Sequence, residues 1–84
     1  MEKTFKIKNR LGIHARPASL LAQTASKFAS DITLFKEDKK TDCKSILGIM
    51  MLAVEYGASL KVVIDGPDEQ EAMHAIGILI EKKI

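Results

Sequence analysis

Polar and apolar residues alternate along residues 3–8, 31–36 and 60–65, a period that predicts half-buried β-strands. A short fourth strand, ending at Cys43, follows the polar turn Glu37–Lys39 and predicts a hairpin with residues 31–36. Elsewhere the apolar residues recur every three or four positions, as in amphipathic helices. These helices are predicted from Pro17 to near Ser30, from Ser45 to about Glu55, and from Asp68 to the end of the chain.

Residue types at the helix ends refine these boundaries. Ser45 can cap the second helix, because its hydroxyl can accept a hydrogen bond from a first-turn amide. Gly57 is a typical terminator for that helix, and Asp68 with Glu71 resembles a capping box for the third. The apolar face of the first helix is predicted to comprise Ala18, Leu21, Ala22, Ala25, Phe28 and Ala29, and that of the third Ala72, Met73, Ile76, Leu79 and Ile80, with His74 in solvent.

The element order is therefore strand, helix, strand, strand, helix, strand, helix. Helices that cover one face of a mainly antiparallel sheet give an α+β domain of two layers. The 84 residues are expected to form one domain, without room for a deep cleft between lobes. Its chemistry is therefore expected at the surface.

Composition narrows the class of protein. The apolar fraction of 46% and charged fraction of 29% are ordinary for a globular domain and argue against disorder. A net charge of +2, from 13 basic and 11 acidic residues, lacks the concentrated basic stripe of a nucleic-acid binder. Cys43 is the only cysteine, no apolar run could span a membrane, and the N-terminus does not resemble a signal peptide. We therefore expect a cytoplasmic protein that does not insert into membranes.

The segment Gly12–Ala18 (GIHARPA) is predicted to form an anion site at the start of the first helix. Pro17 is typical of a first helical turn, which would leave the backbone amides of Ala15, Arg16 and Ala18 pointing out of the helix end. Arg16 adds a permanent charge in a planar fork that suits phosphate. His14 is a candidate nucleophile, since a neutral imidazole can accept a phosphoryl group. Gly12, two residues earlier, can take positive φ or permit close backbone approach.

A second group of residues is apolar without an evident core to enter. In the helix after Ser45, Ile49 and Leu52 can face inward, which leaves Ile46, Leu47 and Met50 outside. Leu20 likewise lies off the apolar face of the first helix. Either another element covers these side chains, or they form a protein-docking patch, and a single exposed leucine such as Leu20 is not unusual.

Two motifs together resemble the HPr family, the histidine-containing phosphocarriers of the bacterial phosphotransferase system. They are Gly12–Ala18 and Lys44–Met50 (KSILGIM), in the family's order and spacing. The resemblance covers essentially the whole chain. It implies an open-faced β-sandwich, with a four-stranded antiparallel sheet covered on one face by three helices.

By the same resemblance, Nδ1 of His14 would accept a phosphoryl group from enzyme I and pass it to IIA domains of sugar permeases, while Arg16 stabilises the phosphate. Ser45 would match the serine that a regulatory serine kinase/phosphorylase modifies, and a transcription regulator would be a further partner. Leu20, Leu47 and Met50 would belong to the docking surface. The family often has a small polar residue where this chain has Leu11, so the backbone amides would contribute more to phosphate binding. A monomeric carrier without metal, cofactor or turnover of its own is implied.

Two other classes of function compete with this interpretation. A metal site, or a hydrolase with His14 as general base, lacks partners at ligand spacing, and Ser19 and Asp31 suggest no triad. The remaining alternative is a nitrogen-branch or regulatory HPr-like phosphocarrier that is not dedicated to sugar uptake; Leu11 resembles some members of the nitrogen-related branch. The presence of His14 argues against relatives that have lost this histidine, but it does not separate the two branches.

Overall fold

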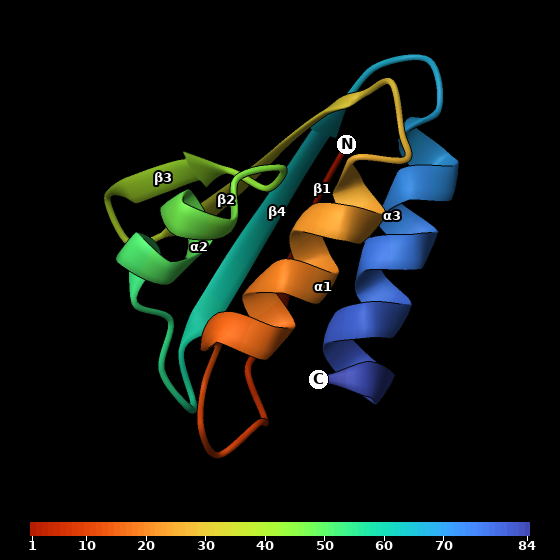
Figure 1. Ribbon diagram of the computed structural model, residues 1–84. Helices are drawn as coiled ribbons and strands as arrows, with labels where there is room; N and C mark the ends of the chain where they lie inside the picture. The colour runs from red at the N-terminus through yellow and green to blue at the C-terminus, as the bar shows by residue number, and fades with distance from the viewer.

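A computed structural model describes residues 1–84 and contains the predicted order of elements (Figure 1). The strands are β1 (Glu2–Lys6), β2 (Asp31–Lys36), β3 (Lys39–Asp42) and β4 (Ser59–Asp65). The helices are α1 (Ala15–Ala25), α2 (Ile46–Leu52) and α3 (Glu69–Ile78), and α3 continues into a π-helical turn, η1 (Leu79–Lys83).

The four strands form one antiparallel sheet in the order β1-β4-β2-β3. All three helices lie on the same face of this sheet, with α1 packed against both α2 and α3 (Figure 1). The register places Phe5 opposite Leu60 and Leu34 opposite Val62, so the apolar residues of neighbouring strands share the helix-facing side. The predicted α+β open-faced β-sandwich is confirmed.

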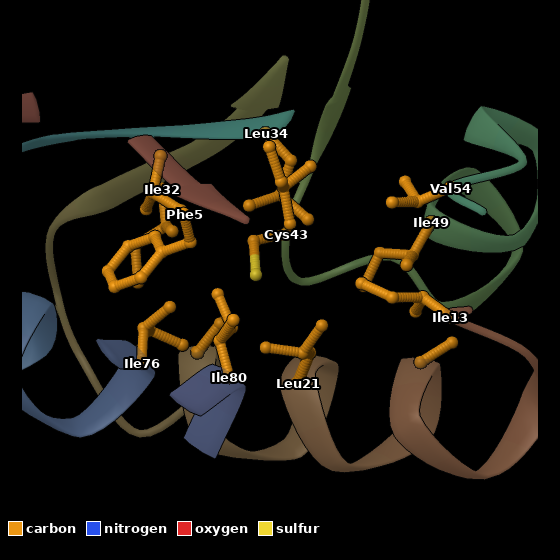
Figure 2. Packing of buried hydrophobic residues seen from close by; sticks show 14 of the residues in the cluster. Phe5, Ile13, Leu21, Ile32, Leu34, Cys43, Ile49, Val54, Ile76 and Ile80 are labelled. Atoms are coloured by element: carbon orange, nitrogen blue, oxygen red, sulfur yellow. The ribbon is translucent and has the colours of Figure 1, made fainter. Parts of the chain in front are cut away.

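The hydrophobic core fills the space between the sheet and the helices. Figure 2 shows Leu21, Ile76 and Ile80 from the helical layer directed toward side chains of the sheet. Each fully buried aliphatic side chain contributes about 1.5–3 kcal/mol relative to an exposed one. The cluster comprises Phe5, Ile7, Ile13, Ala18, Leu21, Ala22, Ala25, Ile32, Leu34, Cys43, Ile49, Leu52, Val54, Leu60, Val62, Ile64, Ala72, Ile76 and Ile80.

The predicted end of the first helix was wrong. The helix stops at Ala25, where Ser26 turns its hydroxyl back onto the carbonyl of Ala22 at 2.7 Å. Phe28 is half-buried and Ala29 is exposed, so the predicted apolar face does not continue through Ala29. The chain leaves the helix early because it must bring Ser30, which is buried, toward β2.

The predicted end of the second helix was also wrong. The helix stops at Leu52 rather than near Glu55, and Ala53 adopts a left-handed conformation with φ 54° and ψ 55°. Gly57 is not its terminator; it has φ 85° in the following turn. An early stop is needed because Val54, 3% exposed, leaves the helix to join the core.

Asp68 lies at the N-cap position of α3, but the predicted capping box is absent. Its carboxylate instead accepts hydrogen bonds from the amides of Ala29 (2.9 Å) and Ser30 (3.0 Å) and from the hydroxyl of Ser30. The Ser30 hydroxyl and these two amides hold the pKa of Asp68 below its ordinary value. Asp68 therefore joins the loop before β2 to the loop before α3.

Two other predictions, the helix cap at Ser45 and the exposure of His74, are confirmed. The hydroxyl of Ser45 caps α2 by accepting from the amide of Gly48 at 2.9 Å. His74 is exposed on α3. Cys43 follows β3 directly and is fully buried (Figure 2), and this burial raises the pKa of its thiol to about 12.

We expect Asp68→Asn to destabilise the domain at neutral pH, because an amide cannot replace a charged acceptor of three hydrogen bonds. The folded state holds the carboxyl pKa low, so this stabilisation is present above about pH 4 and is lost as the pH falls through the lowered value. Urea unfolding between pH 7 and pH 2 should show the difference from wild type shrinking in acid. Glu71→Gln is the control: a loss of stability comparable to that of Asp68→Asn would favour the capping box instead.

Candidate functional site

His14 is the N-cap residue of α1 and its side chain is exposed. The helix begins at Ala15, so Pro17 occupies the third helical position rather than the first. Proline fits there for the same reason, since the early amides of a helix have no helical acceptor. The sequence thus placed His14 correctly at the start of the helix. The helix itself begins two residues earlier than it would if Pro17 occupied the first helical position.

The loop before His14 is fixed by backbone hydrogen bonds. Gly12 has φ 67°, and a Cβ at this position would collide with the carbonyl oxygen of Val54. The next residue, Ile13, donates its amide hydrogen to that same carbonyl at 2.8 Å. Both expectations for Gly12, positive φ and close backbone approach, are therefore met at one point of contact.

Asn9 organises the start of this loop, a role that the sequence analysis missed. Its side-chain oxygen accepts from the amide of Leu11 at 3.2 Å, and its side-chain nitrogen donates to the carbonyl of Gly12 at 3.0 Å. The amide of Gly12 donates to the carbonyl of Asn9 at 2.9 Å. An asparagine that forms a hydrogen bond to the backbone two residues further along is typical of turns. Asn9 shortly before Gly12 could therefore have predicted this turn from the sequence.

The start of α1 can receive an anion. The amides of Ala15 and Arg16 precede the first amide with a helical acceptor, and no acidic residue lies in the first turn to offset their partial positive charge. The prediction for Ala18 was wrong, because its amide donates to the carbonyl of His14 at 2.9 Å as the first bond of the helix. Arg16 is exposed and forms no ion pair within the chain, so its guanidinium is free to bind phosphate.

Apolar side chains are exposed on α1 and α2, the two helices that pack against each other beside this site. On α2, Leu47 is 67% exposed, and Ile46 and Met50 are close to half exposed. Leu20 on α1 is 37% exposed. All four residues, which we call the apolar patch, keep part of their side chains in solvent. Met51, 72% exposed, adds to it and was not predicted.

Ser45 is half-buried at the start of α2, directly before Ile46 and Leu47. Its hydroxyl oxygen accepts the capping bond, which leaves its own hydrogen without a role in the cap. A group attached to this oxygen would therefore lie beside the apolar patch.

The site is a surface feature and not a cleft. None of the hollows in the surface is lined by His14 or Arg16. None of the helices combines the length and apolar composition that crossing a bilayer requires. A group at His14 is therefore open to the face of another macromolecule.

Comparison with known proteins identifies the family. The sequence profile described as "PTS HPr component phosphorylation site" matches residues 1–82. The phosphocarrier protein HPr of Treponema pallidum is 44% identical over 81 residues, which cover 96% of this chain and 92% of that protein. The HPr-like protein Crh of Halalkalibacterium halodurans is 43% identical over 83 residues, 99% of each chain.

A solved structure agrees with both. The crystal structure of HPr-C-His from Thermoanaerobacter tengcongensis has a TM-score of 0.94 and 52% identity, and the match covers 99% of this chain and 93% of that one. Proteins of the HPr family are phosphocarriers and not turnover catalysts. With a matching profile along nearly the whole length and the same fold, the chain belongs to the HPr family of phosphocarriers.

Proposed function

We propose that this phosphocarrier accepts a phosphoryl group from enzyme I on Nδ1 of His14 and passes it to IIA domains of sugar permeases. The observation that carries the proposal is the position of His14. It lies exposed at the mouth of α1, beside two amides without a helical acceptor and an arginine without an ion pair. An enzyme-like cleft is not needed, because each reaction partner is itself a protein.

The chemistry is a reversible substitution at phosphorus. A lone pair of His14 Nδ1 forms the N–P bond as the bond from phosphorus to the donor breaks, and the same N–P bond breaks when the acceptor attacks. The amides of Ala15 and Arg16 and the Arg16 guanidinium stabilise the phosphoryl oxygens through charge-assisted hydrogen bonds. These contacts hold the group between the two transfers.

Incubation with enzyme I and phosphoenolpyruvate should label the wild-type protein with an acid-labile, base-stable phosphate. His14→Ala should abolish the label, whereas His74→Ala, which removes the other histidine, should retain it. Arg16→Ala should slow labelling by about 10- to 100-fold, the kinetic equivalent of one charge-assisted hydrogen bond. A label that survives in His14→Ala would refute the proposal.

The apolar patch of Leu20, Ile46, Leu47 and Met50 is proposed as the docking surface for enzyme I and for the acceptors. Because a single histidine must meet both proteins in turn, both must bind on the side where His14 is exposed. The flexible side chain of Met50 suits partners of different shape. Sequential use of one surface also ensures that donor and acceptor do not bind together.

Leu47→Ala and Met50→Ala should each raise the KM for enzyme I by about tenfold, since exposed apolar anchors contribute most when a partner buries them. Folding stability should be almost unchanged, because both side chains are exposed in the free protein. Ile78→Ala is the matched control. It removes an apolar side chain of α3 that is 37% exposed and lies outside the patch. Equal KM values for all three variants would place docking elsewhere.

Ser45 is proposed as a regulatory phosphorylation site for a serine kinase/phosphorylase, with a transcription regulator as a further partner of the modified protein. Phosphorylation would add about −1.5 to −2 charges beside Ile46 and Leu47. The first-turn amides of α2 can accept this charge, so the helix should persist while docking over the patch becomes unfavourable.

Two substitutions separate the cap from the switch. Ser45→Ala should lower the free energy of unfolding by about 1 kcal/mol but leave the phosphotransfer rate unchanged. Ser45→Asp should keep the cap and lower the rate of transfer from enzyme I, measured as kcat/KM for labelling of His14. Unchanged transfer in Ser45→Asp would count against an electrostatic gate at this position.

A regulatory or nitrogen-branch HPr-like carrier is the second candidate. The 43% identity with an HPr-like Crh protein over the full chain favours it, as does Leu11 at the position before Gly12. Transfer from the labelled protein to a sugar IIA domain and to a nitrogen-branch IIA domain, measured side by side, distinguishes the two roles.

We place the carrier in the cytoplasm, with its proposed partners, and expect it to act as a monomer. An HPr of Thermoanaerobacter tengcongensis, 52% identical to this chain, is described as a dimer in one crystal structure. Sedimentation of the labelled and unlabelled protein tests whether the active form here is the monomer.

A further inference from the structure

Lys36, at the end of β2, is held unusually firmly for a lysine. Its side chain is only 13% exposed. The ammonium donates to the carbonyl of Ala53 at 2.7 Å and pairs with the carboxylate of Glu55 at 3.0 Å. This is the only ion pair in the chain, and both contacts cross from the sheet to the segment that follows α2.

The two partners of Lys36 flank the residue that anchors the phosphoryl site. Between Ala53 and Glu55 lies Val54, whose carbonyl accepts the amide hydrogen of Ile13, the residue before His14. The side chains of Val54, Ile13 and Ile49 also gather at one end of the core (Figure 2). Lys36 therefore binds the residues on both sides of Val54, whose carbonyl accepts the hydrogen bond from the loop before His14.

The segment that Lys36 binds, residues 53–55, contains a strained backbone conformation. Ala53 has φ 54° and ψ 55°, a region that residues with a Cβ adopt rarely. Such a conformation persists only when its surroundings hold it. The hydrogen bond from Lys36 to the Ala53 carbonyl holds this conformation from outside α2, together with the burial of Val54 in the core.

We propose that Lys36 is a positioning residue for phosphotransfer: its clamp on Ala53 and Glu55 fixes the Val54 carbonyl, and through the Ile13 bond it fixes His14. This inference rests on the proposed role of His14 as phosphoryl acceptor. Lys36 itself does not touch the phosphoryl group. Without the clamp, residues 53–55 relax from the strained conformation and the His14 loop loses its fixed support.

Lys36→Met tests the clamp by two independent measurements. Hydrogen exchange of the Ile13 amide should accelerate by about tenfold or more, because its acceptor is no longer held. The rate of His14 phosphorylation at saturating phospho-enzyme I should fall by about tenfold, since small displacements of a reacting group are costly, whereas KM should hardly change. Loss of stability alone would leave the saturating rate unchanged and would accelerate the Ile13 amide no more than the amides of the central strands, so the two measurements together separate the clamp from destabilisation.

Matched variants keep the test decisive. Lys40→Met removes an exposed lysine from the neighbouring strand and should behave as wild type. Lys36→Arg should restore most of both signals, because a guanidinium can donate to both partners. Glu55→Gln, at an exposed position, should give an intermediate effect even if Lys36→Met folds poorly. Ala53→Gly should reduce the effect of Lys36→Met in a double-mutant cycle, since glycine adopts the left-handed conformation without strain.

The outcomes separate the clamp from the proposed function. If Lys36→Met and Lys40→Met exchange the Ile13 amide at the same rate, the clamp is refuted whatever the phosphorylation rate. If exchange accelerates but the saturating rate does not fall, Lys36 holds the loop without positioning His14, and the proposal is overturned. If the wild-type protein is not phosphorylated at His14, the proposed function fails, and Ile13 exchange still decides whether the clamp exists.

Discussion

The hydrogen bond from the Ile13 amide to the Val54 carbonyl is the interaction on which the site depends. His14 is exposed, as its proposed role requires, so its side chain is not held by the core. Its position is therefore set through the backbone, by a bond of 2.8 Å made one residue earlier. Gly12 makes this bond geometrically accessible, because any side chain there would push the two segments apart.

Further backbone hydrogen bonds connect the chain on either side of this contact, between residue 7 and residues 57–58. The amide of Ile7 donates to the carbonyl of Ala58 at 2.9 Å, and the amide of Gly57 donates to the carbonyl of Ile7 at 2.8 Å. Two loops distant in sequence are thus fastened to each other at successive points, and the buried side chains of Ile7, Ile13 and Val54 lie beneath them. This rigid support keeps the loop before His14 in place while other proteins bind and dissociate, as a carrier at a protein surface requires.

Local pattern was sufficient to predict most of the fold and the centre of the site. The alternation in the strands and the three- to four-residue spacing in the helices correctly predicted two layers, and in the structure Phe5, Leu34 and Leu21 are buried in one core between them. His14 and Arg16 were found because proline and arginine have position-specific chemistry at a helix start. The sequence left open whether another element covers the outer face of α2, and the structure shows this face to be exposed.

Features that depend on contacts distant in sequence could not be predicted in this way. Asp68 has the local sequence pattern of a helix cap. Its carboxylate instead accepts hydrogen bonds from the amides of Ser30 and Ala29, which lie 38 and 39 positions away in the sequence. Ala53 ends α2 in a conformation that favours glycine, because burial of Val54 and the bond from Lys36 outweigh its local preference. The Val54 carbonyl has no side-chain signature at all, so no residue type could have revealed it.

The burial of Cys43 has a practical consequence for following the carrier at work. Its thiol is inaccessible and, with a pKa raised to about 12, almost entirely protonated at neutral pH, so it is a poor nucleophile in the native state. A cysteine introduced on the exposed surface of α1 or α2 would be the one thiol available to maleimide reagents. Fluorophores or spin labels can thus be attached beside His14 in an otherwise unaltered chain, which makes the docking of successive partners directly observable by spectroscopy.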